Sequence, residues 1–245
     1  MLKLPGYHVR ALLHRGAGFT VYRGTRDSDA LPVVIKVPAK EYPSLGELTR
    51  LKQEYEVATS LGVPGVVSCC ALEKHRNALA LIMKDSGGAS LDELAHGAPL
   101  ELGFFLAVAI KLADTLALVH EKGIIHKDLR PANIVATRDA QVVEIIDFGV
   151  ASLLSTELQR EPSSSSFFEG TLTHISPEQT GRINRNLDHR SDLYSLGITF
   201  YELLTGQLPF QSSDPLEMLH WHLARTPLPA SRVNPSVPEA LSAIV

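Results

Sequence analysis

Between Ile124 and Gly149 the chain reads IIHKDLRPANIVATRDAQVVEIIDFG, and this stretch constrains the fold more than any other. It carries a His-x-Asp that ends at Asp128, an asparagine five residues later, and an Asp-Phe-Gly that begins at Asp147, on a predicted strand-turn-strand unit. A carboxylate such as Asp128 can accept a hydroxyl proton, and the oxygens of Asn133 and Asp147 suit a hard cation such as Mg²⁺. These residue types at this spacing indicate phosphoryl-transfer chemistry.

The two motifs resemble the catalytic loop and the metal-binding motif of protein kinases. From about Tyr7 onward, essentially the whole chain is similar to a eukaryotic-like Ser/Thr protein kinase catalytic domain. The resemblance implies an α+β, two-lobed protein-kinase fold. A small antiparallel sheet with one main helix is expected over residues 1–84, and a larger, mostly helical lobe over residues 85–245, truncated before its final helices.

Composition agrees with a globular protein. A chain of 245 residues, 44% of them hydrophobic, can bury roughly 70–75% of its unfolded surface. The formal net charge of −4 is small and mixed in sign, so nothing indicates a nucleic-acid partner. The only two cysteines, Cys69 and Cys70, are adjacent, which offers no disulfide framework and suits a reducing compartment.

The sequence contains no predicted signal peptide or membrane span. Residues 1–18 lack the continuous apolar segment of a signal peptide. The apolar run 102–119 is interrupted by Lys111 and Asp114, so it predicts a buried helix of a soluble protein. We therefore expect a cytoplasmic protein without membrane insertion.

Residues 7–37 alternate in hydrophobicity and predict three short strands. The first turn, at residues 14–21, is similar to the kinase glycine-rich loop that folds over ATP phosphates, and the resemblance assigns Gly16, Gly18 and Val21 to the nucleotide. The match is incomplete, because other residues occupy the first and third glycine positions and Gly18 is displaced by one. An ordinary hairpin turn is the alternative.

The strand at residues 33–37 has the form of the V-A-I-K strand of kinases. Lys36, inside an apolar strand, either reaches solvent at an edge or, as the resemblance implies, holds the α- and β-phosphates, with Val34 above the adenine. A helix predicted from about residue 45 to residue 60 offers two glutamates. Glu54 lies beside its apolar stripe and Glu56 nearly opposite, so Glu54 is the predicted partner of Lys36.

Two more strands are predicted, at residues 66–71 and 78–83, and the second leads into a glycine-bearing turn. This turn is similar to the connection between kinase lobes. The resemblance implies that main-chain groups of Lys84 and Ser86 meet the adenine edge, that Met83 guards the back of the pocket, and that Val135 also contacts the nucleotide. A simple strand-to-helix loop is the alternative.

In the catalytic loop, the resemblance assigns the role of base to Asp128 and a structural role beside the Phe of Asp-Phe-Gly to His126. Two neighbours depart from the common pattern. Lys127 replaces an arginine that often pairs with a phosphorylated activation loop, and an ammonium cannot form the bidentate fork of a guanidinium. Arg130 stands where most Ser/Thr kinases have lysine, which keeps a positive charge near the γ-phosphate.

Residues 150–178 form a predicted activation segment. We hypothesise that one serine of Ser163–Ser166, or Thr171, is phosphorylated and steadied by Lys127 and neighbouring arginines. The part from Gly170 to Glu178 resembles the kinase segment that ends in A-P-E, and the position of Thr171 favours a Ser or Thr acceptor.

An apolar helix is predicted to begin near Asp192 and to stop at Gly206. Asp192 is either a favourable charge at a helix N-terminus or, as in kinases, an anchor for the catalytic-loop backbone. Residues 227–238 predict a proline-spaced connection, followed by the start of one more helix. The family's arginine partner for Glu178 lies beyond this chain, so we expect a fragment of a longer polypeptide.

The run from Ser176 to Phe210, together with His-Lys-Asp, is particularly similar to bacterial kinases at the N-terminus of very large fusions with an AAA-type ATPase, a GAF domain and a sensor histidine kinase. The implied function is transfer of the ATP γ-phosphate to a Ser/Thr hydroxyl of a protein, with Mg²⁺ (or Mn²⁺) and the downstream domains of the same polypeptide as partners. Implied catalytic residues are Lys36, Glu54, Asp128, Arg130, Asn133 and Asp147, with Asn133 and Asp147 as metal ligands.

Two alternatives remain open at this point. The irregular glycine-rich loop, Lys127 and Arg130 also fit a pseudokinase, a nucleotide-binding or docking module without phosphotransfer. A small-molecule phosphotransferase of related fold would share the loop and metal residues but should lack the segment 170–178.

Overall fold

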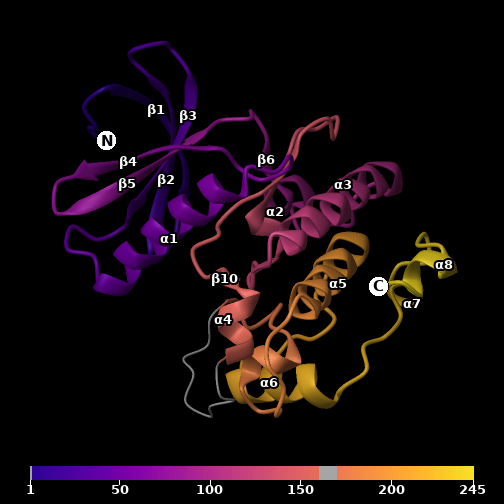
Figure 1. Cartoon of the computed structure of the whole chain (residues 1–245). Coiled ribbons are helices and arrows are strands. Elements are labelled where there is room, and N and C mark those ends of the chain that lie inside the picture. Colours follow the sequence, from indigo (N-terminus) through magenta and orange to yellow (C-terminus); the bar gives the residue numbers. More distant parts are fainter. Residues whose placement is uncertain (1, 160–169) are drawn as a thin grey trace.

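The computed structural model describes residues 2–159 and 170–245, which form two lobes of α+β structure (Figure 1). The small lobe contains β1 (Tyr7–Arg15), β2 (Phe19–Arg26), β3 (Pro32–Pro38), α1 (Leu45–Leu61), β4 (Cys69–His75) and β5 (Ala78–Lys84). The larger part contains β6 (Ala89–Ser90), α2 (Leu91–Ala95), α3 (Leu102–Glu121), β7 (Ile124–Ile125), the 3₁₀ turn η1 (Pro131–Asn133), β8 (Ile134–Ala136), β9 (Val143–Ile145), β10 (Ser152–Leu153), α4 (Leu154–Gln159), η2 (Pro177–Thr180), α5 (Arg190–Thr205), α6 (Pro215–Ala224), α7 (Ala230–Val233) and α8 (Glu239–Ser242).

The small lobe is a five-stranded antiparallel sheet in the order β1-β2-β3-β5-β4, and the three strands predicted before Val37 are confirmed. Because side chains alternate along a strand, β3 serves both faces of the sheet. Val33, Ile35 and Val37 are buried in a cluster on the outer face. Lys36 points to the opposite face, toward α1, where Glu54 is buried.

Helix α1 begins and ends as its sequence predicts. Ser44 accepts a hydrogen bond from the Glu47 backbone and Glu47 accepts one from the Ser44 backbone, which is a complete capping box. The helix ends at Gly62 in the left-handed conformation, with φ of 56°. Its buried residues recur every three or four positions and pack on the inner face of the sheet: Leu51, Glu54, Ala58 and Leu61.

The prediction of a strand at residues 66–71 is wrong at its first end. Strand β4 begins only at Cys69, because Val66 and Val67 pair with β9 instead of β5. The Val67 backbone N–H donates to the Ile145 carbonyl at 3.1 Å, and the Ile145 N–H donates to the Gly65 carbonyl at 2.8 Å. These bonds join the small lobe to the strand that leads into Asp147.

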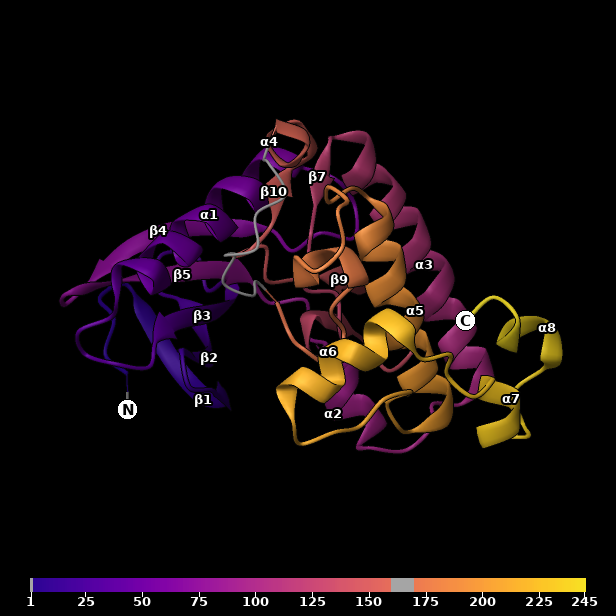
Figure 2. The same cartoon turned by 90° about the horizontal axis from the view of Figure 1, so that it is seen from below.

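Helices α3 and α5 lie side by side and form the centre of the larger lobe, as both views show (Figures 1 and 2). Phe105 is the fully buried aromatic residue of α3, and the centroid of its ring lies 5.3 Å from that of Phe200 in an edge-on arrangement. Phe104, one position round the helix, is only half-buried. By length and composition alone α3 could also cross a membrane, a property shared by the core helices of many soluble proteins.

The C-terminal part follows the predicted order with two additions, the helices α6 and α7. Helix α5 ends at Thr205, and Gly206 adopts a φ of 74°, which closes the helix as expected. The connection predicted at residues 227–238 contains the short helix α7, and α8 begins after Pro238. In Figure 2 both short helices lie at the edge of the larger lobe, away from the small lobe.

Two glycines near the end of α1 offer a matched test of how the segment after α1 packs on Thr115 of α3. Gly65 has a φ of 81°, and a Cβ at this position would lie 2.0 Å from Thr115 Oγ1. Gly62 has a φ of 56° but open space around its Cβ position. We expect Gly65→Ala to lower the free energy of unfolding by about 3 kcal/mol and Gly62→Ala by only about 1 kcal/mol, because only the first adds a steric clash to backbone strain. Urea denaturation of both variants measures the difference, and equal losses would contradict the packing described.

Candidate active site

One buried carboxylate, that of Asp192, binds the backbone of the loop that carries Asp128. Asp192, at the start of α5, is fully buried and accepts three hydrogen bonds, each of 2.8 Å, from the His126 backbone, the Lys127 backbone and His120 Nε2. The predicted alternative of a mere helix-terminal charge is therefore wrong. Because a buried carboxylate needs several donors, these bonds fix the loop backbone relative to α3 and α5.

His126 has the structural role that was predicted for it. Its ring is buried and lies 4.7 Å from the Phe148 ring in an edge-on arrangement. Its Nε2 lies 3.0 Å from the Ile146 carbonyl, and its Nδ1 accepts the Asp128 backbone N–H at 3.2 Å. These contacts tie the Asp128 loop to the segment that carries Asp147.

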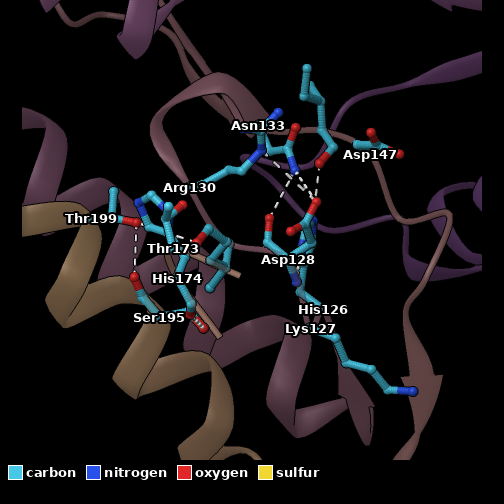
Figure 3. A network of polar contacts seen from close by, with 12 residues as sticks. His126, Lys127, Asp128, Arg130, Asn133, Asp147, Thr173, His174, Ser195 and Thr199 are labelled. Carbon is cyan, nitrogen blue, oxygen red and sulfur yellow. Dashed lines mark hydrogen bonds and ion pairs between the residues drawn. The ribbon is translucent and has the colours of Figure 1, made fainter. Parts of the chain in front are cut away.

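Asp128 and Asn133 are joined directly (Figure 3). Asn133 Nδ2 donates to the Asp128 carbonyl at 2.8 Å and to its Oδ2 at 2.9 Å. With both amide protons used in this way, the Asn133 amide oxygen remains as an acceptor. Asp128 Oδ1 is buried and has no hydrogen-bond partner among residues 2–159 and 170–245. An unpaired buried carboxylate oxygen is a feature expected where a substrate hydroxyl binds.

Lys36 connects the small lobe to the Asp147 segment. Its Nζ lies 2.7 Å from Glu54 Oε2 and 2.9 Å from Asp147 Oδ1. Burial by itself lowers the pKa of Lys36, but the carboxylates of Asp147 and Glu54 outweigh it and raise that pKa above its usual value. Burial raises the pKa of Asp147, and the Lys36 ammonium outweighs burial and holds that pKa below its usual range. Lys36 and Asp147 are therefore both charged. Glu56, by contrast, is exposed, so the choice of Glu54 is confirmed.

Two residues of the site adopt a backbone conformation that is unusual for side chains other than glycine. Lys127 has a φ of 68° and Asp147 a φ of 65°. Each such residue costs about 1–3 kcal/mol and persists only where surrounding contacts hold it. Here the Lys127 carbonyl accepts from Gln179 Nε2 at 2.8 Å, in addition to the bond that its N–H makes with Asp192.

Asn133 and Asp147 fit the donor set of a hard divalent cation. Asn133 offers the amide oxygen that its own hydrogen bonds leave over, and the Asp147 side chain is 38% exposed beside it. Within the part of the chain that the structure describes, no cluster of three or more His, Cys, Asp or Glu side chains could hold a metal. A cation bound by these two residues would therefore complete its shell with substrate phosphates and water, as Mg²⁺ usually does.

A cavity of about 180 Å³ opens beside this cluster, between the sheet and the larger lobe. Six of the residues predicted to contact a nucleotide line it: Val21, Val34, Met83, Lys84, Ser86 and Val135. The cavity is also lined by residues that sequence reasoning missed, among them Arg23, Asp85 and Glu93. Strand periodicity could have indicated Arg23, because it shares a strand face with Val21.

The glycine turn does not line this cavity. Gly16 lines a second cavity, of about 580 Å³, on the outer side of the sheet. Gly18 lines neither of these two cavities. The turn is closed like an ordinary hairpin, since the Gly16 N–H donates to the Phe19 carbonyl at 2.9 Å. His14 stands at the first glycine position of the kinase pattern, and its side chain occupies part of the turn. A Cβ on Gly16 would lie 2.9 Å from His14 Nε2.

The two residues that depart from the common kinase pattern lie on opposite sides of Asp128. Arg130 Nε is 4.0 Å from Asp128 Oδ2, so its charge is close to the proposed base. Lys127 points away from Asp128 (Figure 3), and its Nζ is 2.7 Å from Glu157 Oε1 of α4. Both members of this second pair are 3% exposed.

The segment that begins at Gly170 lies against the same loop. A Cβ on Gly170 would lie 2.8 Å from the Lys127 carbonyl, so the close approach requires glycine. His174 Nε2 is 3.0 Å from Glu202 of α5, and Glu178 accepts from Ser191 Oγ at 2.5 Å. The predicted phosphorylation sites Ser163–Ser166 lie outside the described residues.

The three hydrogen bonds to Asp192 all need an acceptor at this position. We expect Asp192→Asn to lower the free energy of unfolding by about 3 kcal/mol, because the amide would turn an N–H group toward backbone donors. Its turnover should fall at least about tenfold, since the Asp128 loop loses its support. Asp188→Asn is the control, because Asp188 pairs with the exposed Arg190 and should change stability by under about 0.5 kcal/mol. Equal effects of both variants on denaturation would contradict the anchoring role.

Comparison with known proteins agrees with this geometry. The protein kinase domain family matches residues 7–240. The serine/threonine-protein kinase pkn2 of Myxococcus xanthus is 32% identical over 234 residues, 94% of this chain and 28% of its own length. Pkn1 of the same organism is 33% identical over 95% of this chain and 34% of its own length. PknH of Mycobacterium bovis is 30% identical over 98% of this chain and 39% of its own length.

The match covers nearly the whole sequence, and the chain spans about a third of the length of these relatives. It includes the Asp128 loop, the Lys36 strand and the Asp147 segment that the fold brings together. The chain belongs to the protein kinase domain family.

Proposed function

We propose that this domain transfers the γ-phosphate of ATP to a serine or threonine hydroxyl of a protein. The observation that carries the proposal is the single site formed by Lys36, Glu54 and Asp147 together with Asp128 and Asn133. The serine/threonine-protein kinases among the relatives support the choice of acceptor.

In the proposed mechanism, Lys36 binds the α- and β-phosphates and Glu54 holds its ammonium group in place. Asn133 and Asp147 would hold Mg²⁺ (or Mn²⁺), which neutralises phosphate charge when bound. Asp128 orients the acceptor hydroxyl through its unpaired Oδ1 and takes up its proton. Because these groups are already in place, the site needs little rearrangement to align the hydroxyl with the phosphate.

The nucleotide base would bind in the cavity between the lobes. Val34 and Val135 are apolar lining residues that can enclose a planar ring, and Met83 lies behind them. Main-chain groups of Lys84 and Ser86 would contact the adenine edge. Arg130 would offset charge that develops near Asp128, from which its Nε is 4.0 Å away.

We further propose that the domain is a cytoplasmic signalling module of a larger bacterial protein, with residues 1–84 and 85–245 as its two lobes. A hybrid signal transduction histidine kinase of Dictyostelium discoideum, 32% identical over 60% of this chain and 6% of its own length, supports fusion with other domains. The acceptor would be a separate protein or one of the fused domains.

Activation-segment phosphorylation is a separate hypothesis, at Ser163–Ser166 or Thr171. Lys127 already lies 2.7 Å from the Glu157 carboxylate, so a phosphate would have to join or replace that contact. Mass-spectrometric mapping of active protein is expected to show phosphate on one of these residues. Active protein without any phosphate there would remove the hypothesis.

Turnover of MgATP by the full-length protein, measured as phosphate transferred to a protein acceptor, tests the function. We expect Asp128→Asn to lower kcat by about 10²–10⁴-fold, because the acceptor loses its base. Asp147→Asn should abolish detectable transfer, because it removes a cation ligand and a Lys36 partner. Arg26→Ala, in an exposed ion pair with Asp29, is the control and should leave kcat unchanged. Nucleotide binding with no transfer in the wild type would instead identify a pseudokinase.

A further inference from the structure

Arg23 of β2 forms an ion pair with Asp85 at the edge between the two lobes, and both residues line the proposed nucleotide cavity. Its Nε donates to Asp85 Oδ2 at 2.6 Å and its Nη2 donates to Asp85 Oδ1 at 3.2 Å. The same Nη2 donates to the Gly88 carbonyl at 3.1 Å. One guanidinium therefore holds two residues of the turn between the lobes, and all three residues line the cavity.

Asp85 is the centre of this turn. Its side chain is only 8% exposed, against 36% for Arg23. Its Oδ1 also accepts the Gly87 backbone N–H at 2.9 Å, and its own N–H donates to the Pro32 carbonyl at 3.0 Å. The Asp85 carboxylate thus fixes the main chain after Ser86, and the Asp85 N–H fixes the main chain before it; the Ser86 backbone is expected to contact the adenine.

Gly88 continues the link into the larger lobe. A Cβ at this position would lie 2.6 Å from Val135 Cγ1 and 2.8 Å from the Ala136 carbonyl, so its backbone packs directly on β8. Strand β8 in turn follows Asn133. Through Gly88, Arg23 therefore connects a strand of the small lobe to the strand of the larger lobe that begins directly after Asn133, a proposed metal ligand.

We propose that Arg23 is a positioning residue for the nucleotide: it holds the turn 84–88 and the spacing of the two lobes, and so determines affinity for ATP. The inference rests on the proposed function for the identity of the ligand. The contact requires arginine, because a guanidinium can bridge two carboxylate oxygens and a carbonyl at once, whereas a lysine ammonium is a single point charge. Asp85 acts with it through the same contact.

Steady-state kinetics of Arg23→Ala, Asp85→Ala and the double variant, in the full-length protein, test the proposal. Each single variant is expected to raise the KM for ATP by about three- to tenfold and to leave kcat within about twofold, because a contact that binds ground and transition states equally affects KM alone. The double variant should raise the KM for ATP no further than the single variant with the larger rise, because both substitutions remove the same contact.

Charge alone predicts a different outcome. Removing a cation should weaken binding of anionic ATP, and removing an anion should strengthen it. If Arg23→Ala raises the KM while Asp85→Ala lowers it, the effect is electrostatic and the positioning role is overturned. An unchanged KM in both variants overturns it as well.

The Arg26–Asp29 pair supplies a matched control, because Arg26 lies three residues further along the same strand and its pair is exposed, away from the cavity. Arg26→Ala is expected to leave the KM for ATP unchanged.

Should an alanine variant fail to fold, Arg23→Lys keeps the charge and the aliphatic stem but not the bridge, and it should still raise the KM for ATP. A wild-type KM in Arg23→Lys would then overturn the proposal.

Direct binding separates this inference from the proposed function. Titration calorimetry with MgATP gives a Kd that needs no phosphate transfer. If the wild type binds MgATP without transferring phosphate, the proposed function fails. The positioning role is then tested by the Kd alone: a three- to tenfold rise in Kd for Arg23→Ala supports it, and an unchanged Kd overturns it. If the wild type does not bind MgATP, both fail.

Discussion

The ammonium group of Lys36 joins three segments that are far apart in the chain, namely β3, helix α1 and the segment that begins at Asp147. Burying one ion costs several kcal/mol, and close partners must offset this cost. Glu54 at 2.7 Å and Asp147 at 2.9 Å supply that compensation. Because Glu54 faces inward only when α1 is seated on the sheet, the position of the helix and the position of the Lys36 ammonium depend on each other.

A second buried charge organises the other half of the site. Asp192 accepts hydrogen bonds from the backbone on both sides of the strained Lys127, and it also binds His120 of α3. The left-handed conformation of Lys127 turns its side chain away from Asp128 and toward Glu157. Thus the same backbone geometry that presents Asp128 also determines what Lys127 contacts.

The connection between the lobes is polar as well. Arg23 bridges to Asp85 and Gly88, while the Gly65 and Val67 backbone groups bond to Ile145. Both links contribute lining residues to the cavity between the lobes, Arg23, Asp85 and Gly88 in the first and Val67 in the second. Together they restrict how the small lobe can move relative to Asn133 and Asp147, which are expected to hold the cation.

Local pattern and chemistry could be predicted from the sequence. The strands around Lys36, the capped helix with Glu54 facing inward, and the grouping of Asp128, Asn133 and Asp147 all follow from short-range periodicity and motif spacing, and the structure places them as expected. The start of β4 could not be predicted, because Val66 and Val67 are apolar in either pairing and only the presence of β9 decides between them.

The sequence by itself therefore determined the family and the side chains that the candidate site brings together, because these depend on side-chain chemistry at fixed spacing. Only the tertiary structure decided that the glycine turn lies off the cavity, that Lys127 meets Glu157, and that Arg23 meets Asp85 across 62 positions of the chain. Such contacts join distant segments, and their partners are chosen by how the lobes pack rather than by any local pattern.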